Sequence, residues 1–213
     1  MLLTGWNFKN KSVLDIGCGR GEALKYANDK GATHLVGTDF SESAIQYCKN
    51  LYDKEGNIFF MLMEAKDTLV FNVYHYVFML DVIEHIPNEE MQIIYPKIFK
   101  ALKPSGIFII KTPFYQSQES YENTWVLSDD DKEVHINIQS KKRLLNDLEK
   151  VGFYKLSSHY YQKSPILFTS MLHAYRYELR IKISNWKRRI MHPLRSLHFL
   201  KLKIGWWIKS IKK

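Results

Sequence analysis

The stretch over residues 12–24 constrains the fold of this chain more than any other part of the sequence. An apolar run ends at Ile16, glycine then occurs at every second position, at Gly17, Gly19 and Gly21, and a helical pattern follows. Glycines spaced in this way predict a tight turn from strand to helix, because a bare backbone allows a ligand to lie close against it. We therefore expect a ligand-binding loop directly after the first strand.

Strand and helix signals alternate through about residue 161. Short apolar or β-branched runs predict strands at Val13–Ile16, Leu35–Thr38, Ile58–Met63, Tyr76–Leu80, Ile107–Thr112 and Tyr154–Tyr161. Helical patterns predict helices at Gly21–Lys30, Ser43–Tyr52 and Glu89–Leu102, and one more between a Ser140 cap and Gly152. This alternation predicts an α/β fold: a Rossmann-like, mostly parallel sheet with helices on both faces.

The glycine spacing indicates which kind of ligand the loop holds. The loop reads G-x-G-x-G behind Asp15, whereas dinucleotide enzymes use G-x-G-x-x-G to hold a diphosphate. This loop resembles the first motif of class I S-adenosylmethionine-dependent methyltransferases. Further blocks resemble that family in the same order: Asp39 at the end of the second strand, Glu64-Ala65 after the third, Leu80–Ile86 after the fourth, and Leu102–Ile110 at the turn into the fifth.

The resemblance implies a cofactor, S-adenosyl-L-methionine, and a set of residues around it. Asp39 would meet the ribose, and Asp15 would orient the glycine turn while approaching the methionine moiety. The expected cofactor-binding residues are Asp15, Gly17, Cys18, Gly19, Gly21, Asp39, Phe40, Glu64, Ala65 and Leu80.

Residues 113–139 interrupt the alternation with a long polar connection that contains several aromatic residues, which is more typical of a functional lid than of an idle loop. The order of His135, the helix start at Ser140 and the Gly-Phe after it resembles a subset of the family associated with small-molecule and glycan methylation. His135 is thus the first candidate for a general base and His85 the second, although either ring could serve only for packing. Glu84 is expected to be exposed at a helix start.

The composition is typical of a folded enzyme in a reducing compartment. The chain has 213 residues, of which 46% are apolar, so it can bury one substantial core. Its two cysteines, Cys18 and Cys48, have no metal-ligand spacing, and no metal is expected. We find no signal peptide and no apolar run long enough to span a membrane, and we expect a cytoplasmic protein.

Charge divides the chain into two parts, which we expect to be a methyltransferase domain over 1–162 and a helical tail over 163–213. Residues 1–162 hold 18 Lys and Arg against 21 Asp and Glu, a net charge of −3, whereas residues 163–213 hold 13 against 1, a net charge of +12. In the tail, apolar residues recur every three or four positions from Leu172 to Ile190 and again from Leu197 to Ile211. This pattern predicts two basic amphipathic helices.

The tail allows several functions. Basic faces opposite apolar faces suit a helix that lies on an anionic membrane surface, so the protein could be peripheral on the inner face of the membrane. The apolar stripes could instead dock on the body of the enzyme or on a second copy in a homodimer, and the basic residues could follow RNA. The Asn-Pro-Pro-aromatic signature of base-amino methyltransferases is missing after the fourth strand, which argues against a nucleic acid partner.

Taken with the family resemblance, these features favour O-methylation of a sugar or related polar group, a small-molecule or glycan acceptor in cell-surface glycan or lipid-linked assembly. The alternatives are an RNA methyltransferase that uses the basic tail and a non-catalytic adenosylmethionine-binding module.

Overall fold

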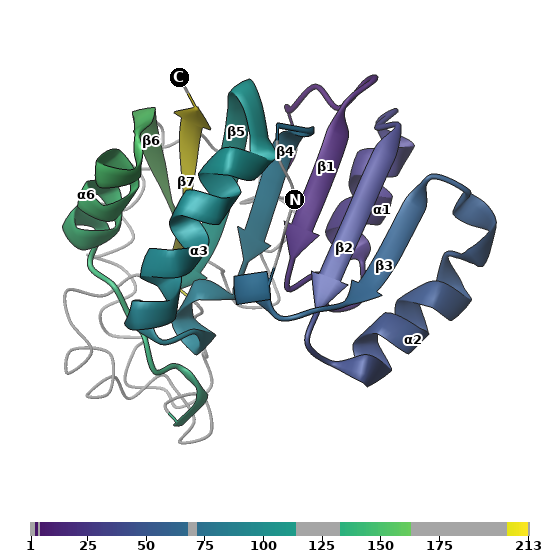
Figure 1. Ribbon diagram of the computed structural model, residues 1–213, viewed down its shortest axis with the longest axis horizontal. Helices are drawn as coiled ribbons and strands as arrows, with labels where there is room; N and C mark the ends of the chain where they lie inside the picture. The colour runs from purple at the N-terminus through teal and green to yellow at the C-terminus, as the bar shows by residue number, and fades with distance from the viewer. Residues whose placement is uncertain (1–2, 4, 68–71, 114–132, 163–203, 213) are drawn as a thin grey trace, which may run out of the picture.

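The protein is built around one seven-stranded sheet, with strand order β3-β2-β1-β4-β5-β7-β6 (Figure 1). The computed structural model describes residues 3, 5–67, 72–113, 133–162 and 204–212. The strands are β1 (Ser12–Ile16), β2 (His34–Asp39), β3 (Ile58–Leu62), β4 (Tyr74–Leu80), β5 (Leu102–Pro113), β6 (Phe153–Gln162) and β7 (Ile204–Lys212). Neighbours from β3 to β5 pair in parallel, whereas β7 runs antiparallel to both β5 and β6.

Helices cover both faces of the sheet, as the sequence predicted. They are α1 (Glu22–Asp29), α2 (Glu42–Leu51), α3 (Asn88–Ala101) and α6 (Lys141–Val151), with short 3-10 turns at Asp53–Glu55, Ala65–Asp67 and Ile83–His85 (η3). Side chains of a strand alternate between the two faces, so Val13 packs into the core under α1 and α2 and Leu14 into the core under α3 and α6. The apolar runs therefore mark strands buried on both sides.

Local signals in the sequence set the ends of α6. The Ser140 hydroxyl accepts a hydrogen bond from the Arg143 amide at 3.3 Å, which satisfies one of the free N–H groups of the first turn. Gly152 follows the last turn with φ of 110°, a left-handed conformation that favours glycine. Both boundaries confirm the expectation.

The last strand corrects the prediction of a second amphipathic helix. Residues 204–212 form β7 between β5 and β6, with Pro113 opposite Gly205 and Gln162 opposite Ile204. The stripe that ends at Ile211 is thus a strand in its last part, because both neighbours offer hydrogen-bonding edges that a helix could not satisfy. The end of the expected tail belongs to the same sheet as residues 1–162.

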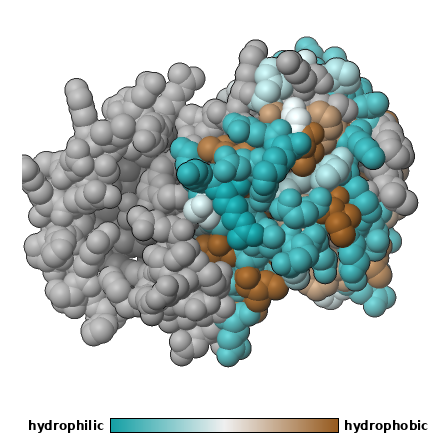
Figure 2. Space-filling model, turned by 60° about the vertical axis from the view of Figure 1, so that its left-hand side comes forward, coloured by the Kyte–Doolittle hydropathy of each residue, from teal (hydrophilic) through white to brown (hydrophobic). Residues whose placement is uncertain are grey.

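The remaining tail predictions, from Leu172 to Ile190 and from Leu197 to 203, lie outside the described residues, as do residues 114–132 of the lid expected over 113–139. Among the helices that the structure describes, we find none long and apolar enough to cross a membrane. On the side that includes α6, the described surface is mostly hydrophilic, and its hydrophobic residues form small separate groups (Figure 2).

Candidate functional site

The glycine loop lies between β1 and α1 and has the left-handed backbone that its sequence indicated. Gly17, Gly19 and Gly21 have φ of 72°, 52° and 73°. A Cβ on Gly17 would lie 2.5 Å from a methyl group of Val82, so the loop is packed directly against the segment after β4. A Cβ on Gly19 would meet nothing within 4 Å. The loop is thus closed on the side of Gly17 and open at Gly19.

Asp39 at the end of β2 holds the loop in place. Its carboxylate accepts hydrogen bonds from the Gly19 amide and the Ser41 amide, each at 2.9 Å. The amides of Gly17 and Cys18 donate to the Thr38 carbonyl at 2.8 and 2.9 Å. Every carboxylate oxygen can accept more than one hydrogen bond, so Asp39 can still meet a ribose hydroxyl at this edge.

Asp15 is a buried acid at the floor of the loop. It is 2% exposed, and in the described part of the chain its Oδ1 finds no hydrogen-bond partner. Burial, together with the nearby Asp39 carboxylate, raises the pKa of Asp15 to about 8. A buried oxygen without a partner is costly, so this position fits a ligand that brings a donor or a positive charge.

The other predicted cofactor residues line the same edge of the sheet with different exposures. Phe40 is 80% exposed beside Asp39 and presents a free aromatic face. Glu64 is exposed and forms a 2.7 Å salt bridge with Lys66, while Ala65 and Leu80 are partly buried against the core. Cys18 is buried, and burial raises the pKa of its thiol well above the usual range.

Glu84 differs from the prediction, because it is buried rather than exposed. Only 1% of it is accessible, and its Oε2 accepts a hydrogen bond from the Thr112 hydroxyl at 2.9 Å. Burial, with the nearby Asp81 carboxylate adding to it, raises the pKa of Glu84 to about 7. The helix start that we expected is the short η3 turn, which points this side chain toward β5 instead of solvent.

The structure brings the two histidine candidates together. The rings of His85, in η3, and His135 have centroids 4.7 Å apart and planes tilted by 58°. The Nδ1 atom of His85 lies 3.0 Å from the Val134 carbonyl, which ties the end of the 113–139 connection to η3. His85 follows the end of β4, on the edge that carries the glycine loop, and His135 lies against it. Their roles stay a prediction.

Sequence reasoning missed the residues that hold this arrangement. Asn137 is buried, donates from its side chain to the Ile86 carbonyl at 2.8 Å, and donates from its amide to the Glu84 carbonyl at 3.0 Å. Thr112 and Val82 were missed as well. The position of Asn137 two residues after His135 was a faint signal of a structural role. The sequence does not reveal the partners that a buried side-chain amide needs, so this role could not be predicted.

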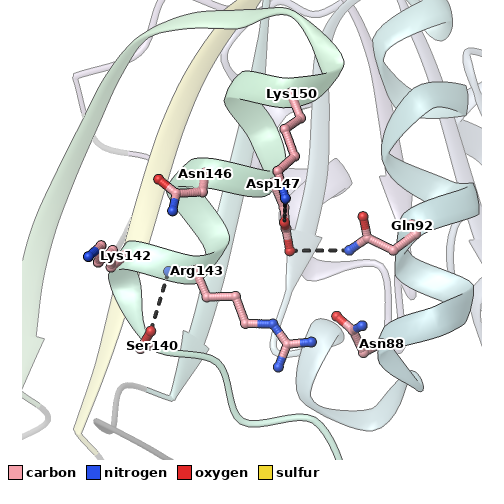
Figure 3. Close-up of a pocket in the computed structure, with 8 residues that line it drawn as sticks. All are labelled: Asn88, Gln92, Ser140, Lys142, Arg143, Asn146, Asp147 and Lys150. Carbon is pink, nitrogen blue, oxygen red and sulfur yellow. Dashed lines mark hydrogen bonds and ion pairs between the residues drawn. The ribbon is translucent and has the colours of Figure 1, made fainter.

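A polar cavity of about 490 Å³ lies between α3 and α6, outside the glycine loop (Figure 3). Within it, Gln92 donates to Asp147 at 3.1 Å, and the Arg143 side chain extends toward Asn88 at the start of α3. The residues that line it do not include any of the predicted cofactor residues. We therefore place the site at the glycine loop.

Known proteins are similar to this chain in sequence and in fold. A family model described as a methyltransferase domain matches residues 1–158. A sterol 24-C-methyltransferase of Schizosaccharomyces pombe is 32% identical over 126 residues, which are 55% of this chain and 29% of that protein. The phosphoethanolamine N-methyltransferase of Plasmodium falciparum is 28% identical over 119 residues, 54% of this chain and 44% of that protein. The chain therefore spans less than half the length of these curated relatives.

Solved structures agree on the fold. A SAM-dependent methyltransferase from Archaeoglobus fulgidus superimposes with a TM-score of 0.67 at 22% identity, covering 97% of this chain and 88% of that chain. Haemonchus contortus phosphoethanolamine N-methyltransferase 2, solved in complex with S-adenosyl-L-methionine, gives a TM-score of 0.66 at 18% identity, covering 98% of this chain and 50% of that one.

The fold and the glycine loop thus define a nucleoside-binding α/β protein. With the family match, the chain belongs to the class I S-adenosylmethionine-dependent methyltransferases, whose cofactor is S-adenosyl-L-methionine.

Proposed function

We propose that this chain transfers a methyl group from S-adenosyl-L-methionine to an oxygen of a sugar or related polar group, in cell-surface glycan or lipid-linked assembly. The observation that supports it most is the pair of histidines, His85 and His135, on the same edge of the sheet as the glycine loop. A hydroxyl acceptor must lose a proton, and imidazole is the side chain suited to accept one near neutral pH.

The residues at the loop fit the cofactor. Asp15 offers a buried carboxylate oxygen to the cationic methionine moiety, Asp39 offers an acceptor to the ribose, and Gly19 leaves room for close approach. The bound cofactor would supply an already activated methyl group. The protein then needs to position the acceptor oxygen, exclude water and accept or conduct the proton, and positioning alone can supply a large part of the rate enhancement.

The acceptor does not follow from the relatives, which differ among themselves. One is named for methylation of a sterol carbon and another for methylation of the nitrogen of phosphoethanolamine. Cofactor motifs are shared by enzymes with unrelated substrates, so the acceptor needs a direct test.

The test has two stages with the purified full chain. Calorimetry first measures S-adenosyl-L-methionine binding, and a homocysteine-release screen then compares sugar nucleotides, glycans, lipids and RNA as acceptors. We expect turnover with a hydroxyl-bearing polar acceptor. Turnover with RNA alone would support a nucleic-acid methyltransferase, and cofactor binding without turnover on any acceptor would support a binding module.

We further propose that the basic segment over 163–203 binds an anionic membrane surface on the inner face of the membrane. It holds 10 basic residues, Lys or Arg, and only 1 acidic residue. The ends that flank it, Gln162 and Ile204, pair with each other at the edge of the sheet where β1, β2 and β4 also end. Binding there would bring the glycine loop close to a lipid-linked acceptor.

This proposal needs a deletion that keeps β7. Because Gln162 and Ile204 are paired, a short turn can replace residues 163–203 without removing a strand. We expect the full chain, but not the deletion variant, to co-sediment with vesicles that contain anionic lipid. Equal sedimentation of the two proteins would contradict it, and a change in oligomeric state on deletion would instead favour docking between two copies.

A further inference from the structure

Glu84, His85 and His135 form a compact cluster of metal-ligating side chains. One potential ligand atom of each residue lies within 4.8 Å of those of the other two. Donors bound to one ion with bonds of about 2 Å lie roughly 3 to 4 Å apart, so modest side-chain rotation would close the cluster around an ion. His85 is exposed.

The hydrogen bonding of His85 is the kind that metal-binding histidines show. A backbone carbonyl can only accept, so the 3.0 Å contact with Val134 requires the proton on Nδ1. In the neutral ring this leaves a lone pair on Nε2. Histidine ligands almost always donate their second ring N–H to a carbonyl or carboxylate, which fixes the orientation of the ring.

Glu84 supplies a buried carboxyl group close to the two rings. It is 1% exposed, it accepts a hydrogen bond from the neutral Thr112 hydroxyl, and it forms no salt bridge with any residue that the structure describes. A buried carboxylate is costly unless a cation or several donors balance it. A divalent ion at the cluster would balance it.

We propose that Glu84, His85 and His135 bind one divalent metal ion beside the glycine loop, and that this ion holds the oxygen of the methyl acceptor. Two imidazoles and a carboxylate suit ions such as Zn²⁺, Co²⁺ or Mn²⁺ better than Mg²⁺, which prefers oxygen ligands. From the sequence we expected no metal. Residue spacing did not indicate this site, because its ligands come from η3 and from a segment distant in the sequence.

The position suits a role in methyl transfer. Val82, which packs against Gly17, lies two residues before Glu84, so the cluster and the cofactor loop share one edge. Three protein ligands leave positions open for substrate, as in catalytic metal sites. With an ion bound, the two imidazoles serve as ligands instead of as the proton acceptor, and an ion-bound hydroxyl releases its proton to solvent more readily. Its oxygen then forms a bond to the methyl carbon as the carbon–sulfur bond breaks, and the sulfur keeps the electron pair. This role rests on the proposed function.

The test uses the untagged full chain, stripped with a chelator and titrated with Co²⁺. Calorimetry gives stoichiometry and affinity, and visible absorption reports nitrogen and oxygen ligands. We expect one ion per chain and at least a tenfold loss of affinity in each of Glu84→Gln, His85→Ala and His135→Ala. The matched control is His34→Ala at the start of β2, on the opposite edge of the sheet, and it should bind Co²⁺ like the wild type.

Two results would overturn the inference: no stoichiometric Co²⁺ on the wild-type chain, or wild-type affinity in all three variants. Circular dichroism and S-adenosyl-L-methionine calorimetry on the same samples separate this outcome from misfolding and from failure of the proposed function. A chain that binds the cofactor but no metal, and keeps turnover after chelation, would exclude a metal ion from the reaction. The histidine pair would then remain the proposed proton acceptor.

Discussion

The Gly19 amide donates a 2.9 Å hydrogen bond to Oδ2 of Asp39, which joins the open part of the glycine loop to the end of the neighbouring strand. Since Asp39 also accepts from the Ser41 amide, one side chain fixes both the loop and the start of α2. Bonds between a carboxylate and backbone amides are among the stronger ones in proteins. Asp39 therefore shapes the site even before a ribose reaches it.

Replacing Asp39 should weaken both the fold and the cofactor site. We expect Asp39→Ala to lower the free energy of unfolding by about 1 to 3 kcal/mol, because two backbone donors lose their acceptor. Affinity for S-adenosyl-L-methionine should fall at least tenfold. Urea unfolding and calorimetry measure the two effects, with the exposed Asp53→Ala as the matched control. Unchanged cofactor affinity in Asp39→Ala would contradict the assignment.

Gly17→Ala should be destabilising for two separable reasons. Its φ of 72° costs a residue with a Cβ about 1 to 2 kcal/mol, and the new methyl group would lie 2.5 Å from Val82. The double variant Gly17→Ala with Val82→Ala should lose less free energy of unfolding than the sum of the losses in the two single variants. It removes the clash with Val82 and keeps only the backbone strain.

Gly56→Ala is the control for backbone strain alone, since its φ is 44° and its Cβ would meet nothing within 4 Å. Urea unfolding of the four variants measures these differences. Strict additivity of the two changes in the double variant would show that Val82 does not restrict Gly17.

Stability should depend on pH through Asp15. Its pKa is raised from 3.8 to about 8, so between these values the folded chain keeps a proton that the unfolded chain has lost. The stabilising contribution is complete below the lower value and is lost as pH rises, by at most about 1.4 kcal/mol per pH unit.

The isosteric Asp15→Asn variant should remove this contribution to the slope. Urea unfolding between about pH 5.5 and 7.5 compares the two proteins at pH values that lie between the unfolded and folded pKa values of Asp15. Glu84, with a pKa raised to about 7, adds a slope of the same sign to both proteins. Parallel pH profiles of the wild type and the variant would show that Asp15 is ionised in the folded chain.

Cofactor binding should release a proton from the same residue. A cationic methionine moiety favours the ionised carboxylate, so binding at about pH 6.5 should displace up to about one proton from Asp15. Calorimetry in two buffers with different ionisation enthalpies measures the number released. The release should disappear in Asp15→Asn, and its persistence there would assign the proton to another group.

Truncation after residue 203 should damage the sheet, unlike the internal deletion of 163–203. The truncation removes β7 and its hydrogen bonds to both β5 and β6, whereas the deletion keeps all of them. We expect a lower midpoint of thermal unfolding in the truncated chain and near wild-type cofactor affinity in the deletion variant. Equal midpoints in the full and truncated chains would mean that β7 contributes little to the fold.

The local sequence determined the elements that carry the cofactor loop. Apolar runs without polar alternation marked the central strands, alternating glycines marked a turn that needs left-handed backbone, and Ser140 and Gly152 marked the ends of α6. These signals work because each depends on interactions within a few residues, such as a cap, a φ angle or the period of a buried strand.

The tertiary structure alone decided three things: that residues 204–212 complete the sheet, that Glu84 is buried, and that His85 meets His135. An apolar stripe of ambiguous period becomes a strand where two strand edges need hydrogen bonds, and a glutamate at a turn is buried when that turn packs on β5. Each depends on contacts between segments far apart in the chain, and the periodicity and spacing of residues carry no record of such contacts.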